Sequence, residues 1–184
     1  WDPVRKEYRA YFRDFRRIGG VRMRDIKTAV SKDFVNWSEP EWCTYPGAPD
    51  EQLYTNQTIP YLRAPHLFVA FPMRYVDQGG RYSSWQDTHN HWPNIEQRKQ
   101  RFASGGNTSR RYGTAVTDAL FMTSRDGRTF SRWRQAFLRP RPGSWAYCDS
   151  MFAWQLVETA SDIPGIQELS MYALEGGWTG ASSR

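Results

Sequence analysis

The feature of this sequence that most constrains its fold is an internal repeat. Residues 25–37 align with residues 118–130 without a gap, and matched positions are 93 residues apart. The matched residues are two aspartates, a serine and a final aromatic residue: Asp25, Ser31, Asp33 and Trp37 in the first copy, and Asp118, Ser124, Asp126 and Phe130 in the second. A repeat of this kind predicts a fold assembled from copies of one supersecondary unit.

Short apolar runs indicate that this unit is built from strands. The apolar and aromatic residues alternate over short distances and are bounded by Gly, Pro, Asp and Asn, a pattern typical of strands and turns. Residues 8–13 and 68–73 are matched runs only 60 positions apart, so the second copy contains 33 additional residues. This insertion falls near residues 76–112, where residues 94–102 predict one short exposed helix.

Each copy predicts a four-stranded antiparallel meander, which is the unit of a β-propeller blade. The expected strands of the second copy cover residues 55–63, 67–75, 117–124 and 130–137. We divide the chain into three blades: blade A, residues 1–45, which lacks its first strand; blade B, residues 54–138, with the insertion 76–112; and blade C, residues 145–184, which is incomplete. The expected fold is all-β, with about two and a half four-stranded blades of a larger propeller.

The composition excludes two broad classes of protein. The 184 residues include 9 Trp, 10 Tyr and 10 Phe, which supply ample area for a packed core and exclude a disordered chain. No apolar run approaches the roughly 18–20 residues that a membrane helix needs, so we expect no membrane partner. The cysteines, Cys43 and Cys148, could form one bridge or be ordinary buried thiols, and one pair is too few for a disulfide framework or a zinc site.

The charge of the chain favours anionic partners. There are 25 Lys and Arg against 19 Asp and Glu, a formal net charge of +6. Such a charge attracts nucleic acid or acidic polysaccharides. The arginines are scattered over every predicted strand instead of forming one stripe, which favours a solvated surface and no nucleic-acid partner. An anionic sugar such as a uronate is the functional interpretation that this pattern favours.

The repeat carries a resemblance to a known enzyme family. Residues 24–37, which read RDIKTAVSKDFVNW, resemble the turn between the third and fourth strands of the five-bladed propeller glycoside hydrolases. That superfamily contains invertases, fructosidases, arabinanases and xylosidases and includes glycoside hydrolase families 32 and 43. Residues 53–61 (LYTNQTIPY) and 71–75 (FPMRY) are similar to bacterial proteins related to this group. The invertase-type Asn-Asp-Pro-Asn and Glu-Cys motifs are absent from the chain.

The resemblance implies a five-bladed propeller that hydrolyses O-glycosyl bonds in a carbohydrate substrate with paired carboxylates and without a cofactor. We therefore expect a carbohydrate-active hydrolase. A non-catalytic propeller that binds a glycan or a protein across the same face is the alternative. The likeness is to bacterial proteins, and both a secreted and a cytoplasmic location remain open.

Candidate catalytic acids follow from the edges of the predicted blades. In an antiparallel meander, the start of strand one, the end of strand two and the start of strand three share one edge. Glycoside hydrolysis needs two carboxylates in different environments, about 5–9.5 Å apart. The candidates on this edge are Asp149, early in an innermost strand, followed by Asp118, Glu175 and Asp25. For Asp25 and Asp118 the structural alternative is a turn residue that accepts backbone N–H groups.

Residues for substrate binding are expected on the same edge. Arg74, at the end of strand two, is the candidate for binding a carboxylate or hydroxyl, and Asn56 lies in strand one. Trp85 and Trp92 of the insertion suit stacking on sugar rings, with packing against the blades as the alternative. The insertion also contains Asp87, His89 and His91, which we interpret as a polar loop rather than a metal site.

Asp33 and Asp126 fall on the opposite edge of the predicted blades. The segments Ser31-Lys32-Asp33 and Ser124-Arg125-Asp126-Gly127 resemble the Asp-box turn of sialidases, in which the carboxylate holds a tight hairpin together. Both aspartates are therefore expected to be structural rather than catalytic.

Overall fold

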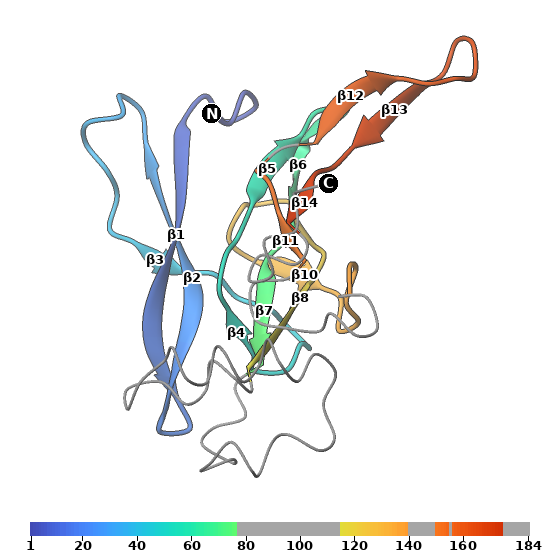
Figure 1. Ribbon diagram of the computed structural model, residues 1–184. Coiled ribbons are helices and arrows are strands. Elements are labelled where there is room, and N and C mark those ends of the chain that lie inside the picture. The colour runs from blue at the N-terminus through green and yellow to red at the C-terminus, as the bar shows by residue number, and fades with distance from the viewer. Residues whose placement is uncertain (77–114, 140–149, 155, 175–184) are drawn as a thin grey trace, which may run out of the picture.

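The computed structural model describes residues 1–76, 115–139, 150–154 and 156–174 (Figure 1). These residues form strands and connecting segments without a helix. The all-β prediction is therefore confirmed for the described part of the chain. Within the same residues, no helix is long and apolar enough to cross a membrane. The predicted helix at residues 94–102 lies outside the described residues.

The first sheet, called sheet A below, is dominated by one long ribbon. Strands β1 (Tyr8–Ile18) and β2 (Val21–Ser31) pair antiparallel over their whole length, and β3 (Glu41–Trp42) adds to β2. Gly19 and Gly20 connect β1 to β2 with φ of 56° and 82°, a conformation that glycine adopts at little steric cost. The ribbon is longer than the predicted strands. The prediction missed its far half because that half has charged side chains on both faces and no apolar alternation.

The second sheet, sheet B, is the predicted four-stranded meander. Its spatial order is β10-β9-β6-β5, and all neighbours are antiparallel. The strands are β5 (Thr58–Tyr61), β6 (Ala64–Ala70), β9 (Met122–Ser124) and β10 (Phe130–Arg132). These match the four strands expected in blade B, which confirms the meander within the described residues.

A three-stranded sheet continues from sheet B. Strand β7 (Met73–Val76) follows β6, and β8 (Val116–Ala119) precedes β9, so the predicted second and third strands are each interrupted. Strand β7 pairs with β8 on one side and with β4 (Gln52–Leu53) on the other. The interruption of strand two falls at Pro72, which has no N–H to donate.

The last described strands form two short antiparallel pairs. Strand β12 (Val157–Ala160) pairs with β13 (Gln167–Ser170), and β11 (Met151–Phe152) pairs with β14 (Ala173–Leu174). The described sheets do not close into a barrel or a propeller, so the five-bladed propeller stays a prediction.

The core lies between sheet A and sheet B. Ile26 of β2, Phe68 of β6 and Phe130 of β10 are each about 1% exposed or less, and Tyr11 of β1 packs against them. Cys43 is a free thiol in this cluster, and burial raises its pKa to about 12. Cys148, with which Cys43 could form a disulfide bridge, lies outside the described residues.

The first Ser–Asp turn joins β2 to the segment before β3. Asp33 Oδ1 accepts the backbone N–H groups of Val35 at 2.9 Å and Asn36 at 2.7 Å. Ser31 Oγ accepts the N–H of Phe34 at 2.9 Å and donates to Asp33 Oδ1 at 3.0 Å. The hydrogen bonds from Asn36 and Val35 hold the pKa of Asp33 well below its usual range. The carboxylate therefore holds this turn together, as predicted.

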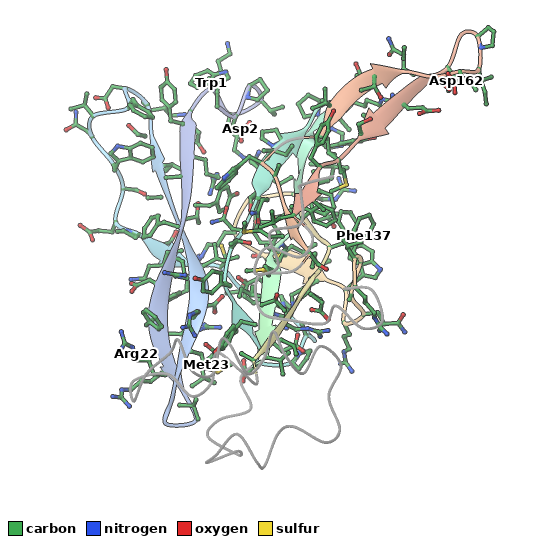
Figure 2. The ribbon with its side chains drawn as sticks, viewed as in Figure 1. Trp1, Asp2, Arg22, Met23, Phe137 and Asp162 are labelled. Atoms are coloured by element: carbon green, nitrogen blue, oxygen red, sulfur yellow. The ribbon has the colours of Figure 1, made fainter. Side chains whose placement is uncertain are left out.

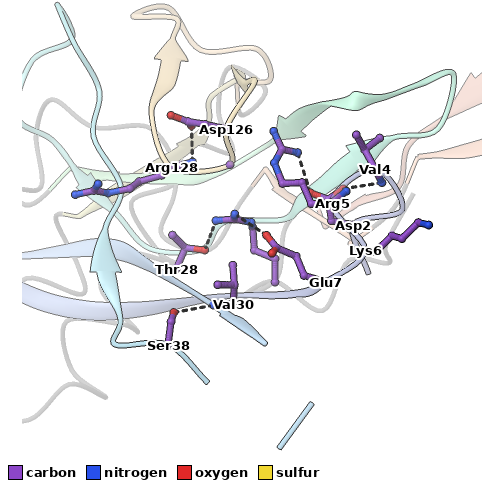
Figure 3. A network of polar contacts seen from close by, with 12 residues as sticks. Asp2, Val4, Arg5, Lys6, Glu7, Thr28, Val30, Ser38, Asp126 and Arg128 are labelled. Atoms are coloured by element: carbon purple, nitrogen blue, oxygen red, sulfur yellow. Dashed lines mark hydrogen bonds and ion pairs between the residues drawn. The ribbon is translucent and has the colours of Figure 1, made fainter. Parts of the chain in front are cut away.

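The second turn, between β9 and β10, repeats these hydrogen bonds. Asp126 Oδ1 accepts the N–H groups of Arg128 at 2.8 Å, drawn in Figure 3, and Thr129 at 2.7 Å. Ser124 Oγ accepts the N–H of Gly127 at 2.8 Å. Partial burial opposes ionisation of Asp126, but the N–H groups of Arg128 and Thr129 outweigh it and lower its pKa to about 2. The repeated sequence thus folds into a repeated structural turn.

Polar contacts join the N-terminal segment and sheet A to this second turn. Tyr11 Oη donates to the Gly127 carbonyl at 2.7 Å, and the Arg5 guanidinium donates to the carbonyl of Arg125. Arg5 is itself held by Asp2 at 2.8 Å. The first repeat is therefore fixed to the turn of the second by side chains as well as by the apolar core.

Candidate active-site edge

The edge where the acids were predicted contains a bidentate ion pair. Arg74 of β7 and Asp118 of β8 are directly opposite each other in the register. Arg74 Nε donates to Asp118 Oδ1 at 2.9 Å, and Nη2 donates to Oδ2 at 2.6 Å. Asp118 is only 5% exposed. Charge-assisted pairs with this fork geometry are among the stronger polar contacts in proteins, so both side chains are firmly positioned.

Glu51 extends the pair to a second arginine. Arg74 Nη1 donates to Glu51 Oε1 at 2.8 Å, and Arg132 Nη2 lies 3.2 Å from Glu51 Oε2. Burial opposes protonation of Arg74, but Asp118 and Glu51 outweigh it and raise its pKa. For Arg132, burial is the largest influence and lowers the pKa. Two guanidinium groups and two carboxylates are therefore joined in one network.

Asp25 has a different environment from Asp118. It is 2% exposed, and its Oδ1 accepts the Tyr45 hydroxyl at 2.9 Å and the Ile26 N–H at 2.8 Å. Its Oδ2 lies 2.5 Å from Nη2 of Arg16. Burial raises the pKa of Asp25 and outweighs the opposing effects of Ile26, Arg16 and Tyr45. Asp25 is thus a desolvated carboxyl that keeps its proton to higher pH than an exposed aspartate.

The two carboxyl groups are linked through Arg132. Its guanidinium lies 5.0 Å from the centre of the Tyr45 ring, and Tyr45 hydrogen-bonds to Asp25. Arg132 also contacts Glu51, which pairs with Arg74 and so reaches Asp118. One continuous chain of charged groups and hydrogen bonds therefore connects the equivalent aspartates of the two repeats.

The alternative prediction, that Asp25 and Asp118 are turn residues, is wrong. Asp25 lies in the middle of β2, opposite Asp14, and Asp118 lies within β8. Neither residue is in a turn, because β2 begins at Val21, before Asp25, and β8 begins at Val116, before Asp118. Apart from the Ile26 N–H, the carboxyl partners found above are side chains, and they come from other elements.

The predicted substrate-binding residues differ in their surroundings. Arg74 is held by Asp118 and Glu51 and also donates to the Arg134 carbonyl at 3.2 Å. Asn56 is 6% exposed, and its Oδ1 is buried without a hydrogen-bond partner in the described part of the chain. An unpaired buried amide oxygen is costly, and Arg16 Nε, Glu51 Oε2 and Arg132 Nε are likewise buried without a hydrogen-bond partner among the described residues.

Four predicted site residues lie outside the described residues: Asp149, Glu175, Trp85 and Trp92. The same holds for the alternative metal ligands Asp87, His89 and His91. Among the residues that are described, no group of three or more His, Cys, Asp or Glu side chains could hold a metal ion.

Sequence reasoning missed the partners of the two aspartates: Arg16, Tyr45, Glu51 and Arg132. Each lies outside the repeated segments or has no counterpart of its type in the other copy. Their contacts depend on how the sheets pack. The sequence itself indicated only that two repeated aspartates lie in strand-rich segments, where a buried acid needs a cationic partner.

Comparison with known proteins assigns no family: no family model matches the sequence, and no match was found among curated proteins or solved structures.

Proposed function

We propose that this protein is a carbohydrate-active hydrolase that cleaves a glycosidic bond with two carboxyl groups. The observation that supports the proposal most directly is the unlike environment of Asp25 and Asp118. Asp25 is desolvated with a raised pKa, whereas Asp118 is held in a bidentate ion pair. Glycosidases need one carboxyl that donates a proton and another that carries charge, and different surroundings separate the two roles.

In this proposal Asp25 is the general acid. Its proton would pass to the leaving oxygen as the glycosidic bond breaks, while a water molecule adds to the anomeric carbon and releases a proton to solvent. Arg16 covers Oδ2 of Asp25 but is 28% exposed in its side chain and lies 5.5 Å from the centre of the Trp42 ring. Rotation of this one side chain would therefore open Asp25 to a substrate.

Asp118 would act as the charged partner. Arg74 fixes both of its oxygens, so the carboxylate would stabilise the positive charge that develops on the sugar ring in the transition state. Arg74 would contribute by positioning Asp118 rather than by binding the substrate itself. Asp149 and Glu175 remain candidates for the same roles by their predicted positions in blade C.

The fold proposed for this hydrolase is the five-bladed propeller. Its support is the repetition of one unit: a meander in the predicted order and two turns with the same hydrogen bonds. Repeated blades bring residues from distant parts of the sequence to one face, as glycoside hydrolysis needs.

A non-catalytic glycan-binding protein is the second candidate. The observation that favours it is that Asp25 and Asp118 each already hold an arginine and are 2% and 5% exposed. In a binding protein these pairs would be scaffold, and the buried, unpaired Oδ1 of Asn56 would be available to a sugar hydroxyl.

The test is release of reducing ends from a panel of neutral and acidic polysaccharides by the native protein and by Asp25→Asn. We expect hydrolysis by the native protein and a loss of at least about 100-fold in Asp25→Asn, the usual scale of general acid catalysis. Asp14→Asn is the matched control, because Asp14 is the cross-strand neighbour of Asp25 and its side chain is 44% exposed.

Two results would decide between the candidates, and a control measurement accompanies them. Equal activity of Asp25→Asn and the native protein would remove Asp25 from the catalytic role. Binding of a polysaccharide without any hydrolysis would favour the binding protein. A thermal melt of each variant distinguishes a lost proton donor from a lost fold.

A further inference from the structure

The two faces of the β1–β2 ribbon carry different charge. Side chains that are directly opposite in an antiparallel pair lie on the same face, and alternate residues share that face. The register therefore sorts the residues near the Gly19–Gly20 turn into two sets. One face, called the arginine face below, carries Arg13, Phe15, Arg17, Arg22 and Arg24; the other carries Asp14, Arg16, Asp25 and Lys27.

The basic side chains Arg16 and Lys27 on the second face each have an acidic partner within the protein. Lys27 Nζ lies 2.8 Å from Asp14 Oδ2, and Arg16 lies 2.5 Å from Asp25. Both carboxylates of the ribbon belong to this face. In the part of the chain that the structure describes, the four arginines of the arginine face take part in no ion pair.

The arginine face also contains an unfavourable cross-strand pair. Arg17 and Arg22 are directly opposite each other, and like charges in this position destabilise a sheet. Both side chains are exposed, and Arg22 lies at the far end of the ribbon, away from the core (Figure 2). An anion bound between them would remove this repulsion.

Aromatic rings orient the neighbouring guanidinium groups. The Arg22 guanidinium lies 4.0 Å from the centre of the Phe15 ring, and that of Arg13 lies 4.7 Å from the centre of the Tyr54 ring. Arg24, which is buried, lies 4.6 Å from the Tyr75 ring and donates to Gln52 Oε1 at 2.7 Å. A guanidinium stacked by its face keeps its N–H edge for a planar or tetrahedral oxyanion.

We propose that the arginine face binds the negatively charged groups of an anionic glycan, through Arg13, Arg17 and Arg22. The ligand chemistry is a carboxylate or sulfate borne on a sugar ring. This inference rests on the proposed function, because it names the substrate class of that carbohydrate-active protein. It accounts for exposed arginines that are gathered on one face without carboxylate partners in the described residues, two of which, Arg13 and Arg22, are oriented by aromatic rings.

A glycan fits this face better than a single-stranded nucleic acid. Proteins that bind single strands without sequence preference use free aromatic rings as stacking platforms for bases. Here Phe15 and Tyr54 stack with arginines, and Phe15 is only 37% exposed. Recognition therefore rests on the guanidinium edges.

The experiment measures binding of the full chain to polygalacturonate, dextran sulfate and neutral dextran by calorimetry at low and at physiological salt. At least one anionic glycan should bind about tenfold or more tightly than neutral dextran, and salt should weaken that binding. Polygalacturonate and dextran sulfate separate carboxylate from sulfate recognition.

Variants test whether the arginine face is responsible. Arg17→Gln with Arg22→Gln should weaken binding of the anionic glycan by about tenfold or more, the scale of a lost charge-assisted contact. Arg63→Gln is the control, because Arg63 is an exposed arginine that pairs with Glu158 near sheet B. It changes the charge in the same sense and should leave binding within about twofold.

The inference is overturned if neutral dextran binds as tightly as both anionic glycans, if Arg63→Gln weakens binding as much as the double variant, or if a single-stranded oligonucleotide binds more tightly than either glycan. Failure of the hydrolase proposal is a different result. Anionic binding lost in the double variant but without hydrolysis by the native protein supports the arginine face and contradicts the hydrolase. Hydrolysis of neutral glycans that the double variant leaves unchanged supports the hydrolase and contradicts the arginine face.

Discussion

At the residue scale, the surroundings of each aspartate determine its role. Asp33 and Asp126 accept two backbone N–H groups each, which lowers their pKa values, whereas burial raises the pKa of Asp25. Aspartates that are equivalent in sequence, such as Asp25 and Asp118, still differ in their partners. Composition and spacing do not separate these cases, because the difference comes from contacts with other elements.

Removing the carboxylate of a Ser–Asp turn should destabilise the fold. Asp126→Ala leaves the N–H groups of Arg128 and Thr129 without their acceptor and should lower the free energy of unfolding by about 1–2 kcal/mol. Asp33→Ala is the matched variant and should also lower stability, since Asp33 accepts backbone N–H groups at the equivalent positions. Urea unfolding at pH 7 measures both, and no loss in either variant would contradict the structural role.

The same turns should make stability fall in acid. The folded pKa of Asp126, about 2, is lower than the ordinary value of 3.8, so its contribution is fully present above pH 3.8. It is lost as pH falls from about 4 through 2. Unfolding curves at pH 5 and pH 3 should therefore differ less in Asp126→Ala than in the native protein. An equal difference in both proteins would contradict this account.

Asp25 should control the alkaline limb of hydrolysis. Its raised pKa means that the carboxyl donates a proton at pH values below that pKa, so the rate should fall as pH rises through it. We expect the residual hydrolysis of Asp25→Asn to lack this limb in a plot of kcat/KM against pH. If the rate of Asp25→Asn still falls over the same pH range, the alkaline limb belongs to another group.

At the element scale, the sequence predicts the strands that have apolar alternation. It predicts the β1–β2 ribbon too short, because the far half of that ribbon lacks the alternation. Sheet B is recovered strand by strand, since each strand contributes apolar residues to a core. The far half of the β1–β2 ribbon is missed, because Arg13, Phe15, Arg17 and their partners lack that pattern. The glycine pair at residues 19–20 was the available hairpin signal.

Replacing one arginine of the cross-strand pair should stabilise the ribbon. Arg17→Glu places opposite charges at the positions of Arg17 and Arg22 and should raise the free energy of unfolding by about 0.2–1 kcal/mol. The gain should shrink at high salt, because both side chains are exposed. Thermal unfolding at two salt concentrations tests this, and a lower melting temperature for Arg17→Glu would contradict it.

At the scale of the whole molecule, the repeat predicts the units, and packing determines how they join. The core residues Ile26 and Phe68 come from runs that sequence periodicity identifies. The chain of contacts from Asp25 to Asp118 was not predictable, since Tyr45 and Arg132 meet their partners only after the sheets pack. Half of the predicted site could therefore be located, and its partners could not be foreseen.

A glycine at the contact between the repeats should be intolerant of substitution. A Cβ at Gly127 would lie 2.9 Å from Arg9 Nε and 2.9 Å from Tyr11 Oη, and φ there is +76°. Gly47 has φ of +75° with nothing within 4 Å of such a Cβ, so Gly47→Ala measures the backbone strain alone. Gly127→Ala should cost more than this control, because the ends of the Arg9 and Tyr11 side chains must shift and the Tyr11 hydrogen bond to the Gly127 carbonyl is disturbed. Equal losses in urea unfolding would show that the contact can relax.

The most direct test of the hydrolase proposal is a crystal structure of the full chain with a bound oligosaccharide from a polysaccharide that is positive in the reducing-end assay. The account predicts that the sugar lies across the edge that holds Asp25 and Asp118, with Arg16 turned away and carboxyl oxygens about 5–9.5 Å apart on either side of the glycosidic bond. An oligosaccharide bound elsewhere, with Asp25 still closed by Arg16, would contradict the proposal and make these acids part of the scaffold.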